Sequence, residues 1–197
     1  RQPEYKYFLY GLYAKVLGGI FFALIYFYYY VGGDTLSYFY SSLALSKLFK
    51  LDPGAYLHVV FGANTRENLS YFTLETGIPY SYMYDDPRTY MVIRLISPVI
   101  ILSFDSYLIT TVTVASLSYI GVWRCYQTFH RYFPKLRTEL AIAFLFMPSC
   151  IFWGSSILKD TFSFSAVCWY LHAFDNLVFR RRSQLSSLFQ LLVSVSL

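Results

Sequence analysis

The stretch FLYGLYAKVLGGIFFALIYFYYYV, Phe8 to Val31, decides the fold class. It carries one charged side chain, Lys15, in 24 residues. A helix of about 20 apolar residues crosses the hydrocarbon core of a bilayer. Lys15 lies near the start of the stretch, so its long stem can carry the ammonium group back to the interface. The aromatic run Tyr26 to Tyr30 is typical of the opposite interfacial belt, and we expect the stretch to span a membrane.

The composition of the chain is that of an integral membrane protein. Of its 197 residues, 56% are hydrophobic, 22% are aromatic and only 14% are charged, whereas soluble domains average about 25% charged residues. The high hydrophobicity excludes disorder, and three cysteines are too few for a disulfide scaffold. The net charge of +5 comes from clusters between apolar runs. The positive-inside rule explains that placement, so we expect no nucleic-acid partner.

Further apolar stretches extend the pattern beyond the first span. They predict an all-α fold, a polytopic transmembrane helix bundle. We expect residues 1–197 to form a single membrane-embedded helical domain, the N-terminal part of a larger protein. The later predicted spans are Ser106 to Trp123, Leu140 to Ser156, Phe162 to Val178 and one that begins at Leu188.

The apolar region Tyr90 to Trp123 allows either one crossing or two. Within it, Met91 to Phe104 is short for a span and fits an interfacial or re-entrant piece. One crossing places both basic clusters on the side of the N-terminus, which is then cytoplasmic, whereas two crossings place them outside. We therefore expect one crossing in a cell inner membrane, with residues 32–87 outside. The clusters are Arg124, Arg131, Lys135 and Arg137 in one predicted loop and Arg180 to Arg182 in another.

The outer segment opens with a predicted surface helix, Thr35 to Lys50. Its apolar residues follow the i, i+3, i+4, i+7 spacing of an amphipathic helix. Flanked by membrane segments, such a helix lies along the bilayer surface. Asp34 directly precedes it, where a side-chain oxygen can accept hydrogen bonds from the first-turn amides. The apolar stripe consists of Leu36, Phe39, Tyr40 and Leu43.

Three places carry charged side chains that can act on a substrate, and each has two interpretations. Asp34 fits a helix N-cap, or a general base or metal-binding carboxylate at the outer surface. In the turn Lys159-Asp160, Lys159 either snorkels or binds a phosphate. Asp160 either caps the next helix or acts as the partner of Lys159 or as a metal ligand. Arg94 either snorkels or contacts a phosphate.

Common catalytic motifs are absent from the sequence. It has no Walker loop, G-x-G-x-x-G, H-E-x-x-H or G-x-S-x-G motif. His58, His130 and His172 have no ligand spacing, and the cysteines form no C-x-x-C pair. The residues therefore establish no cofactor, and a divalent cation at the acidic residues stays open.

The order of these features resembles the N-terminal part of GT-C type membrane glycosyltransferases of bacteria, which use polyprenyl-phosphate-linked sugars. In this family an acidic catalytic residue follows the first span, and Gly33-Asp34 matches that position. Later in this family comes a helix with Pro, followed by a short turn with Asp and another span. In the stretch FMPSCIFWGSSILKDTF, Pro148 matches the Pro and Lys159-Asp160 matches the turn. The chain departs from the family in carrying a single acidic residue where some relatives have an Asp-Glu pair, and in having fewer spans.

The resemblance implies transfer of a sugar from a polyprenyl-phosphate donor to an acceptor at the outer face of the membrane. It implies Asp34 and Asp160 as catalytic residues, with Lys159 and Arg94 offsetting the charge of the lipid phosphate. The implied partners are the polyprenyl-phosphate-linked sugar, membrane lipids and other membrane subunits. Two alternatives stay open: a non-enzymatic membrane subunit or transporter part, and a polysaccharide polymerase.

Overall fold

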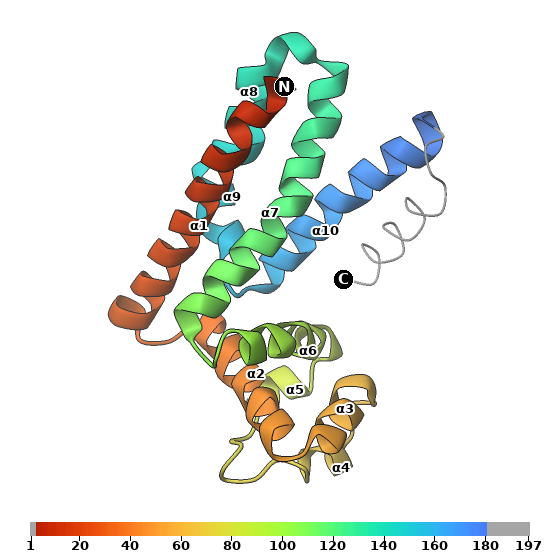
Figure 1. The fold of residues 1–197 in the computed structure, drawn as a ribbon. Helices are drawn as coiled ribbons and strands as arrows, with labels where there is room; N and C mark the ends of the chain where they lie inside the picture. The colour runs from red at the N-terminus through yellow and green to blue at the C-terminus, as the bar shows by residue number, and fades with distance from the viewer. Residues whose placement is uncertain (1–2, 181–197) are drawn as a thin grey trace. The chain divides into compact units, whose positions relative to one another are not determined.

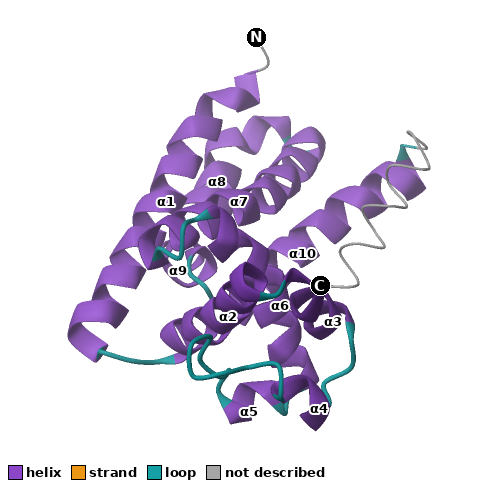
Figure 2. Cartoon of the chain, turned by 60° about the horizontal axis from the view of Figure 1, so that its bottom comes forward, coloured by secondary structure: helices purple, strands orange, loops and turns teal. Residues whose placement is uncertain are grey.

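The protein, seen in a computed structural model that describes residues 3–180, folds into helices and loops without a strand in that range (Figure 2). The all-α prediction is confirmed. The α-helices are α1 (Phe8–Leu24), α2 (Asp34–Leu51), α3 (Pro53–Phe61), α4 (Arg66–Leu69), α5 (Ser81–Tyr84), α6 (Pro87–Leu102), α7 (Tyr107–Tyr132), α8 (Arg137–Ala141), α9 (Pro148–Phe152) and α10 (Lys159–Phe174). Shorter 3-10 and π segments are η1 (Pro3–Tyr7), η2 (Ile25–Tyr30), η3 (Pro134–Leu136), η4 (Ile142–Phe146), η5 (Trp153–Ser155) and η6 (Asp175–Phe179).

The chain divides into two compact units, where the sequence predicts a single domain. Of the described residues, unit 1 comprises 3–22, 114–156 and 160–180, and unit 2 comprises 23–113 and 157–159. Unit 1 brings together segments that are far apart in the sequence, with α1 lying beside α7 and α9 (Figure 1). Helices α1, α7 and α10 each have residues in both units.

Two helical stretches of residues 3–180 are long and apolar enough to cross a membrane. They are Tyr5–Tyr30, which contains α1, and Tyr107–Tyr132, which is α7. Each contains all but one residue of a predicted span, Phe8 to Val31 or Ser106 to Trp123. Helix α6, with 16 residues, is not among them, as expected for a single crossing in the region around it. The orientation of the chain in a membrane stays a prediction.

The predicted span Leu140 to Ser156 is broken. Its two halves, Pro134–Phe146 and Pro148–Ser155, meet at a bend of 44° and form either one broken span or a re-entrant loop. The break falls at Met147, whose φ of −62° and ψ of 121° are extended. Proline has no N–H to donate and disfavours a helical conformation in the residue before it. Pro148 is therefore the local cause of the bend.

The predicted span Phe162 to Val178 forms a helix, α10 continued by η6. It is not among the helices of residues 3–180 that are apolar enough to cross a membrane. Polar side chains on its buried face, among them Thr161, Ser165 and His172, lower its hydropathy. The stretch from Leu188 lies outside the described residues.

Three aromatic side chains of α7 lie in the core of unit 1. Tyr119, Trp123 and Tyr126 from α7 are buried and pack with Cys168 of α10. Phe8 of α1 contacts Trp123 at a ring-centroid distance of 5.0 Å, and the Tyr119 hydroxyl donates a 2.7 Å hydrogen bond to the Phe8 carbonyl oxygen. These contacts attach α1 to the middle of α7.

Helix α2 is the centre of unit 2 and differs from the predicted surface helix. The helix itself is confirmed, but its buried face does not follow the predicted stripe, since Tyr40 is 45% exposed. Three serines that would have made a polar face are fully buried instead. Ser42 Oγ donates to the Ile93 carbonyl oxygen of α6 at 3.1 Å, and Ser46 Oγ donates to Asp105 at 2.7 Å. Small side chains with local partners let α2 pack closely against α6.

Candidate functional site

Asp34 lies at the start of α2 with its side chain exposed. Gly33 occupies the N-cap position, and no side chain accepts a capping hydrogen bond from the first-turn amides of α2. The prediction that Asp34 caps the helix is therefore wrong. Gly33 has a φ of 102°, which glycine adopts without the strain that a side chain would cause. The carboxylate of Asp34 therefore stays free of helix capping. Its charge is favourable at the positive end of the α2 dipole.

A cleft of about 270 Å³ lies at the start of α2 in unit 2, and Asp34 itself is not one of its lining residues. Gly33, which directly precedes Asp34, and Ser37, one helical turn after it, lie in the wall of the cleft, and the ring of Phe27 adds an apolar face. A second cleft of about 210 Å³ also includes Phe27 and extends to Tyr107. The first cleft is lined by Phe27, Val31, Gly32, Gly33, Leu36, Ser37, Tyr40 and Tyr80.

Arg94, predicted to snorkel or to bind a phosphate, contacts the chain itself in unit 2. Its Nη2 donates to the Gly62 carbonyl oxygen at 2.6 Å and to Asn64 Oδ1 at 2.8 Å. The guanidinium also lies over the ring of Tyr90, 4.8 Å from the centroid. Arg94 thus holds Gly62 and Asn64, which follow α3, and its Nη2 is already hydrogen-bonded within the chain.

Lys159 and Asp160 occupy the first turn of α10, and both are exposed. The negative Asp160 is favourable at that helix end. Lys159 belongs to unit 2, where its charge acts on Asp86. The pKa of Asp86 is lowered, first by a hydrogen bond from Thr89 and to a smaller extent by the nearby positive charge of Lys159. Asp160 belongs to unit 1 and Asp34 to unit 2, and their common site stays a prediction.

Lys15 does not snorkel, and that prediction is wrong. Its side chain is 4% exposed, and its ammonium group donates a hydrogen bond to the carbonyl oxygen of Gly154. The close packing of α1 directs it inward: a Cβ on Gly18 would lie 2.5 Å from the carbonyl oxygen of Ile151. With α1 so near α9, the lysine stem reaches the turn that follows α9.

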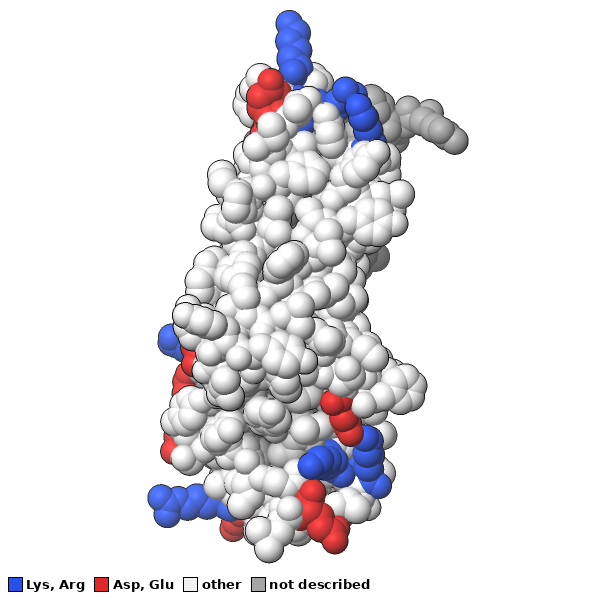
Figure 3. Space-filling model, turned by 90° about the vertical axis from the view of Figure 1, so that its left-hand side faces the viewer, with Lys and Arg blue, Asp and Glu red and all other residues white. Residues whose placement is uncertain are grey.

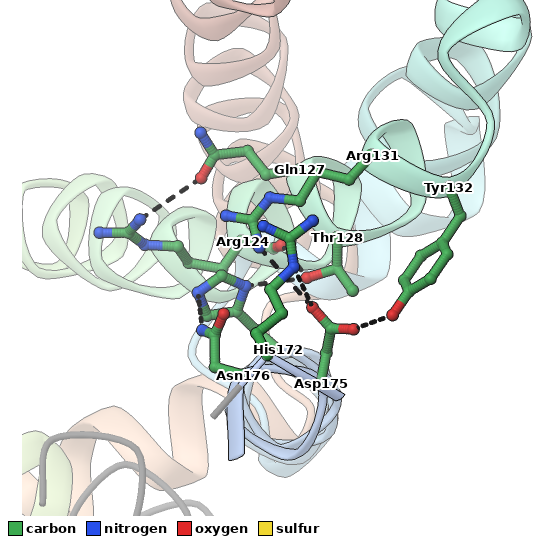
Figure 4. A network of polar contacts seen from close by, with 9 residues as sticks. Arg124, Gln127, Thr128, Arg131, Tyr132, His172, Asp175 and Asn176 are labelled. Carbon is green, nitrogen blue, oxygen red and sulfur yellow. Dashed lines mark hydrogen bonds and ion pairs between the residues drawn. The ribbon is translucent and has the colours of Figure 1, made fainter. Parts of the chain in front are cut away.

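A buried polar network joins the end of α7 to the end of α10 in unit 1 (Figure 4). Its centre is Asp175, which is 4% exposed. The carboxylate accepts a hydrogen bond from the Tyr132 hydroxyl and lies 3.7 Å from Arg131 Nη1 and 3.6 Å from Arg180 Nε. Two guanidinium groups on one buried carboxylate leave the cluster with a net positive charge.

His172 lies beside this centre with both ring nitrogens bonded (Figure 4). Thr128 Oγ1 donates to the Arg124 carbonyl oxygen at 3.0 Å, so it accepts at 2.8 Å from His172 Nδ1. Nε2 then accepts from the amide of Asn176 at 3.0 Å. This hydrogen-bond pattern assigns a neutral imidazole with its proton on Nδ1.

The sequence prediction missed this network because it placed Arg124 and Arg131 in a loop. Helix α7 continues to Tyr132, so both arginines are helical. The signal available in the sequence was an (i, i+3) and (i, i+4) set of polar residues on each segment, with His172, Asp175 and Asn176 in one turn.

On the face drawn in Figure 3, Lys and Arg gather at the upper end of unit 1, where Figure 1 places the turn between α7 and α8.

Comparison with known proteins gives no match to a family model, a curated protein or a solved structure. Within residues 3–180, no three His, Cys, Asp or Glu side chains gather as a ligand set for a metal ion. Of the predicted site residues, Asp34, Lys159 and Asp160 are exposed, and Arg94 is half-buried and bonded to its own unit.

Proposed function

We propose that the chain is part of a membrane glycosyltransferase that transfers a sugar from a polyprenyl-phosphate donor. The observation that carries the proposal is the exposed carboxylate of Asp34, next in sequence to Gly33 in the wall of an aromatic cleft just after the first candidate span. A lipid-linked donor keeps its tail in the bilayer and presents its sugar at this depth. The resemblance in the order of spans and acidic residues supports the same activity.

The residues around the cleft suit each part of such a donor. The rings of Phe27, Tyr40 and Tyr80 offer flat apolar surfaces for the sugar and the first isoprene units. Asp34 is the general base that takes the proton from the acceptor hydroxyl, a role that requires hydrogen-bond reach to that hydroxyl. The exposed Lys159 is the cation for the lipid phosphate, because an ammonium group binds phosphate as a point charge.

Asp160 and Arg94 enter the proposal in different roles. Asp160 is the second acidic residue of the site, next in sequence to Lys159. Arg94 acts mainly as a positioning residue in this proposal, because its Nη2 already holds Gly62 and Asn64. Its Nε is buried, so Nη1 is the nitrogen that this proposal assigns to a phosphate contact.

The test is photo-crosslinking with a polyprenyl phosphate that carries a photoreactive group near its phosphate. Labelling is expected in unit 2 around the cleft and is expected to fall at least about tenfold in Tyr40→Ala, the equivalent of about 1.4 kcal/mol of binding. The matched control is Phe61→Ala, since Phe61 is 82% exposed and lies outside both clefts. Equal labelling of the two variants would reject the cleft as the lipid-phosphate site and favour a non-enzymatic subunit.

A further inference from the structure

Two basic side chains from distant parts of the chain meet at one aromatic ring, at the start of the first candidate span. Lys6 Nζ and the guanidinium carbon of Arg137 each lie 5.9 Å from the centroid of the Tyr7 ring. The Tyr7 hydroxyl and Thr138 Oγ1 share a 3.1 Å hydrogen bond, which joins η1 to α8. A cation is attracted to the negative face of an aromatic ring. These contacts hold two positive charges close together in unit 1.

The two charges have no carboxylate partner within the described residues. None of the ion pairs formed by residues 3–180 includes Lys6 or Arg137. An exposed lysine, Lys135, lies two positions before Arg137 in the chain, and the exposed carboxylate of Glu139 lies two positions after it. Like charges held at short range repel each other. An anion that binds between Lys6 and Arg137 would therefore be favourable.

The end of unit 1 around Tyr7 carries a surplus of positive charge. Gln127 of α7 donates a 3.4 Å hydrogen bond to the Tyr5 hydroxyl, so the last turns of α7 lie beside η1. Figure 3 shows Lys and Arg gathered at the end of unit 1 that includes the turn between α7 and α8. The segments that meet there have a net charge of +3 in the sequence, from Lys6, Arg124, Arg131, Lys135, Arg137 and Arg180 against Glu4, Glu139 and Asp175.

An exposed apolar stripe begins one turn after Tyr7 and follows α1. Its residues recur at the three- and four-residue spacing that places side chains on one face of a helix. They are between 55% and 63% exposed, and only 28% of the apolar window of the first candidate span is buried. The stripe consists of Tyr10, Tyr13, Leu17 and Phe21. The apolar face of α1 is thus available to a ligand that also contacts the cations.

An anionic phospholipid matches both features. Its phosphate lies at the membrane interface, where the end of a spanning helix also lies, and its acyl chains extend into the hydrocarbon core. Lysine and arginine both bind phosphate, and basic side chains next to a spanning helix attract anionic lipids. A soluble phosphate compound or a nucleic acid would match the charges but would leave the apolar stripe in water, and exposed apolar surface of this kind is typical of a site for an apolar partner.

We propose that Lys6, Tyr7 and Arg137 form a binding site for the phosphate of an anionic phospholipid, whose acyl chains lie along the stripe on α1. Arg137 binds the phosphate oxygens through its guanidinium N–H groups, and Lys6 acts as a point charge. The hydrogen bond between the Tyr7 and Thr138 hydroxyls uses one of their two O–H groups, so the other can donate to a phosphate oxygen. This site lies in unit 1 and does not depend on Asp34 or on the proposed sugar transfer.

The test is native mass spectrometry of the purified full chain in detergent, titrated with phosphatidylglycerol or with phosphatidylcholine of the same acyl chains. We expect the first phosphatidylglycerol to bind at least about tenfold more tightly than the first phosphatidylcholine. In Arg137→Gln this preference should fall about fivefold, the factor that corresponds to one cation at an anionic lipid surface. Arg137→Lys keeps the charge and should retain most of the preference, which a purely structural role of the arginine would not explain.

Arg66→Gln is the matched control, because Arg66 is an exposed arginine of α4 in unit 2 and its loss changes the net charge by the same amount. It should keep the full preference. Equal preference in Arg137→Gln and Arg66→Gln would overturn the proposal, and so would equal binding of the two lipids by the unaltered protein. Displacement of phosphatidylglycerol by glycerol phosphate or by single-stranded DNA at equal concentration would assign the site to a soluble ligand and overturn it too. Should Arg137→Gln fail to fold, Lys6→Gln decides by the same measure.

Discussion

The hydroxyl group of Tyr132, in the last turn of α7, donates a hydrogen bond to the carboxylate of Asp175, at the start of η6. Arg131 and Arg180 flank the same carboxylate at 3.7 and 3.6 Å. Because Asp175 is 4% exposed, it neutralises part of the basic cluster from inside unit 1. The cluster that the sequence assigns to loops is thus partly a structural element that joins α7 to α10.

The substitution Asp175→Asn tests this element. The asparagine side chain would keep an oxygen for the Tyr132 hydroxyl but remove the counter-charge of two arginines. Breaking a fully buried pair costs about 3–5 kcal/mol. The side chains of Arg131 and Arg180 are 26% and 36% exposed, so we expect a loss of about 2 kcal/mol in the free energy of unfolding. Denaturant titration in detergent measures it, with the exposed Glu139→Gln as control. Equal stability of the two variants would contradict the assigned role.

The substitution Gly18→Ala tests the close approach of α1 to α9. The added methyl group would overlap Ile151 Cγ2 and lie 2.5 Å from the Ile151 carbonyl oxygen. Because backbone cannot give way as a side chain does, we expect a loss of about 1–3 kcal/mol, the usual effect of overpacking. Gly32→Ala is the control, since its nearest atom would be 3.8 Å away. A thermal melt in which Gly18→Ala matches that control would argue against this contact.

Acid should destabilise unit 2 through Asp105. Partial burial raises the pKa of Asp105, but hydrogen bonds from Lys50 and Ser46 outweigh it, so the pKa lies below its ordinary value of 3.8. A lowered folded pKa contributes stability above the ordinary value, and that stability is lost as pH falls through the folded pKa. Circular dichroism against pH should show this loss. The variant Asp105→Asn should lack the corresponding slope, and an unchanged acid transition in it would assign the loss to other carboxylates.

Cysteine labelling tests the predicted orientation. In a background with Cys125, Cys150 and Cys168 replaced, Ser70→Cys and Lys135→Cys each present one thiol at an exposed position. The positive-inside rule places the basic turn around Lys135 in the cytoplasm. An impermeant thiol reagent on intact cells should therefore label Ser70→Cys only. Labelling of Lys135→Cys alone would reverse the orientation.

The positions of helices could be predicted from the sequence where a long apolar run or a residue that interrupts a helix, such as proline, determines them. The first span and α7 are long apolar runs, and their existence needs no tertiary contact. The break at Met147 also has a local cause, Pro148. It was not predicted because the span Leu140 to Ser156 was identified by its apolar length, which does not register the loss of one N–H donor. The end of α7 was predicted too early because Arg124 and Arg131 look like loop residues until Asp175 is placed beside them.

Pairs that lie far apart in the chain could not be predicted. Lys15 and Gly154 are 139 positions apart, and an isolated lysine near a span end is equally consistent with snorkelling. The contact depends on Gly18, whose lack of a side chain brings α1 against Ile151. Asp34 differed for a local reason, because Gly33 took the N-cap position with a positive φ.

The measurement that tests the central claim most directly is sugar transfer by Asp34→Asn in the full-length protein, per folded molecule, with a polyprenyl-phosphate sugar donor. Asn keeps the size of Asp34 but cannot accept a proton, and loss of a positioned base costs about 10²–10⁴-fold in rate. The control is Glu75→Gln, another exposed carboxylate of unit 2, whose sequence neighbours do not line the cleft as Gly33 beside Asp34 does. We predict a fall of that size for Asp34→Asn and full activity for Glu75→Gln. Turnover close to that of the unaltered protein in Asp34→Asn would contradict the account.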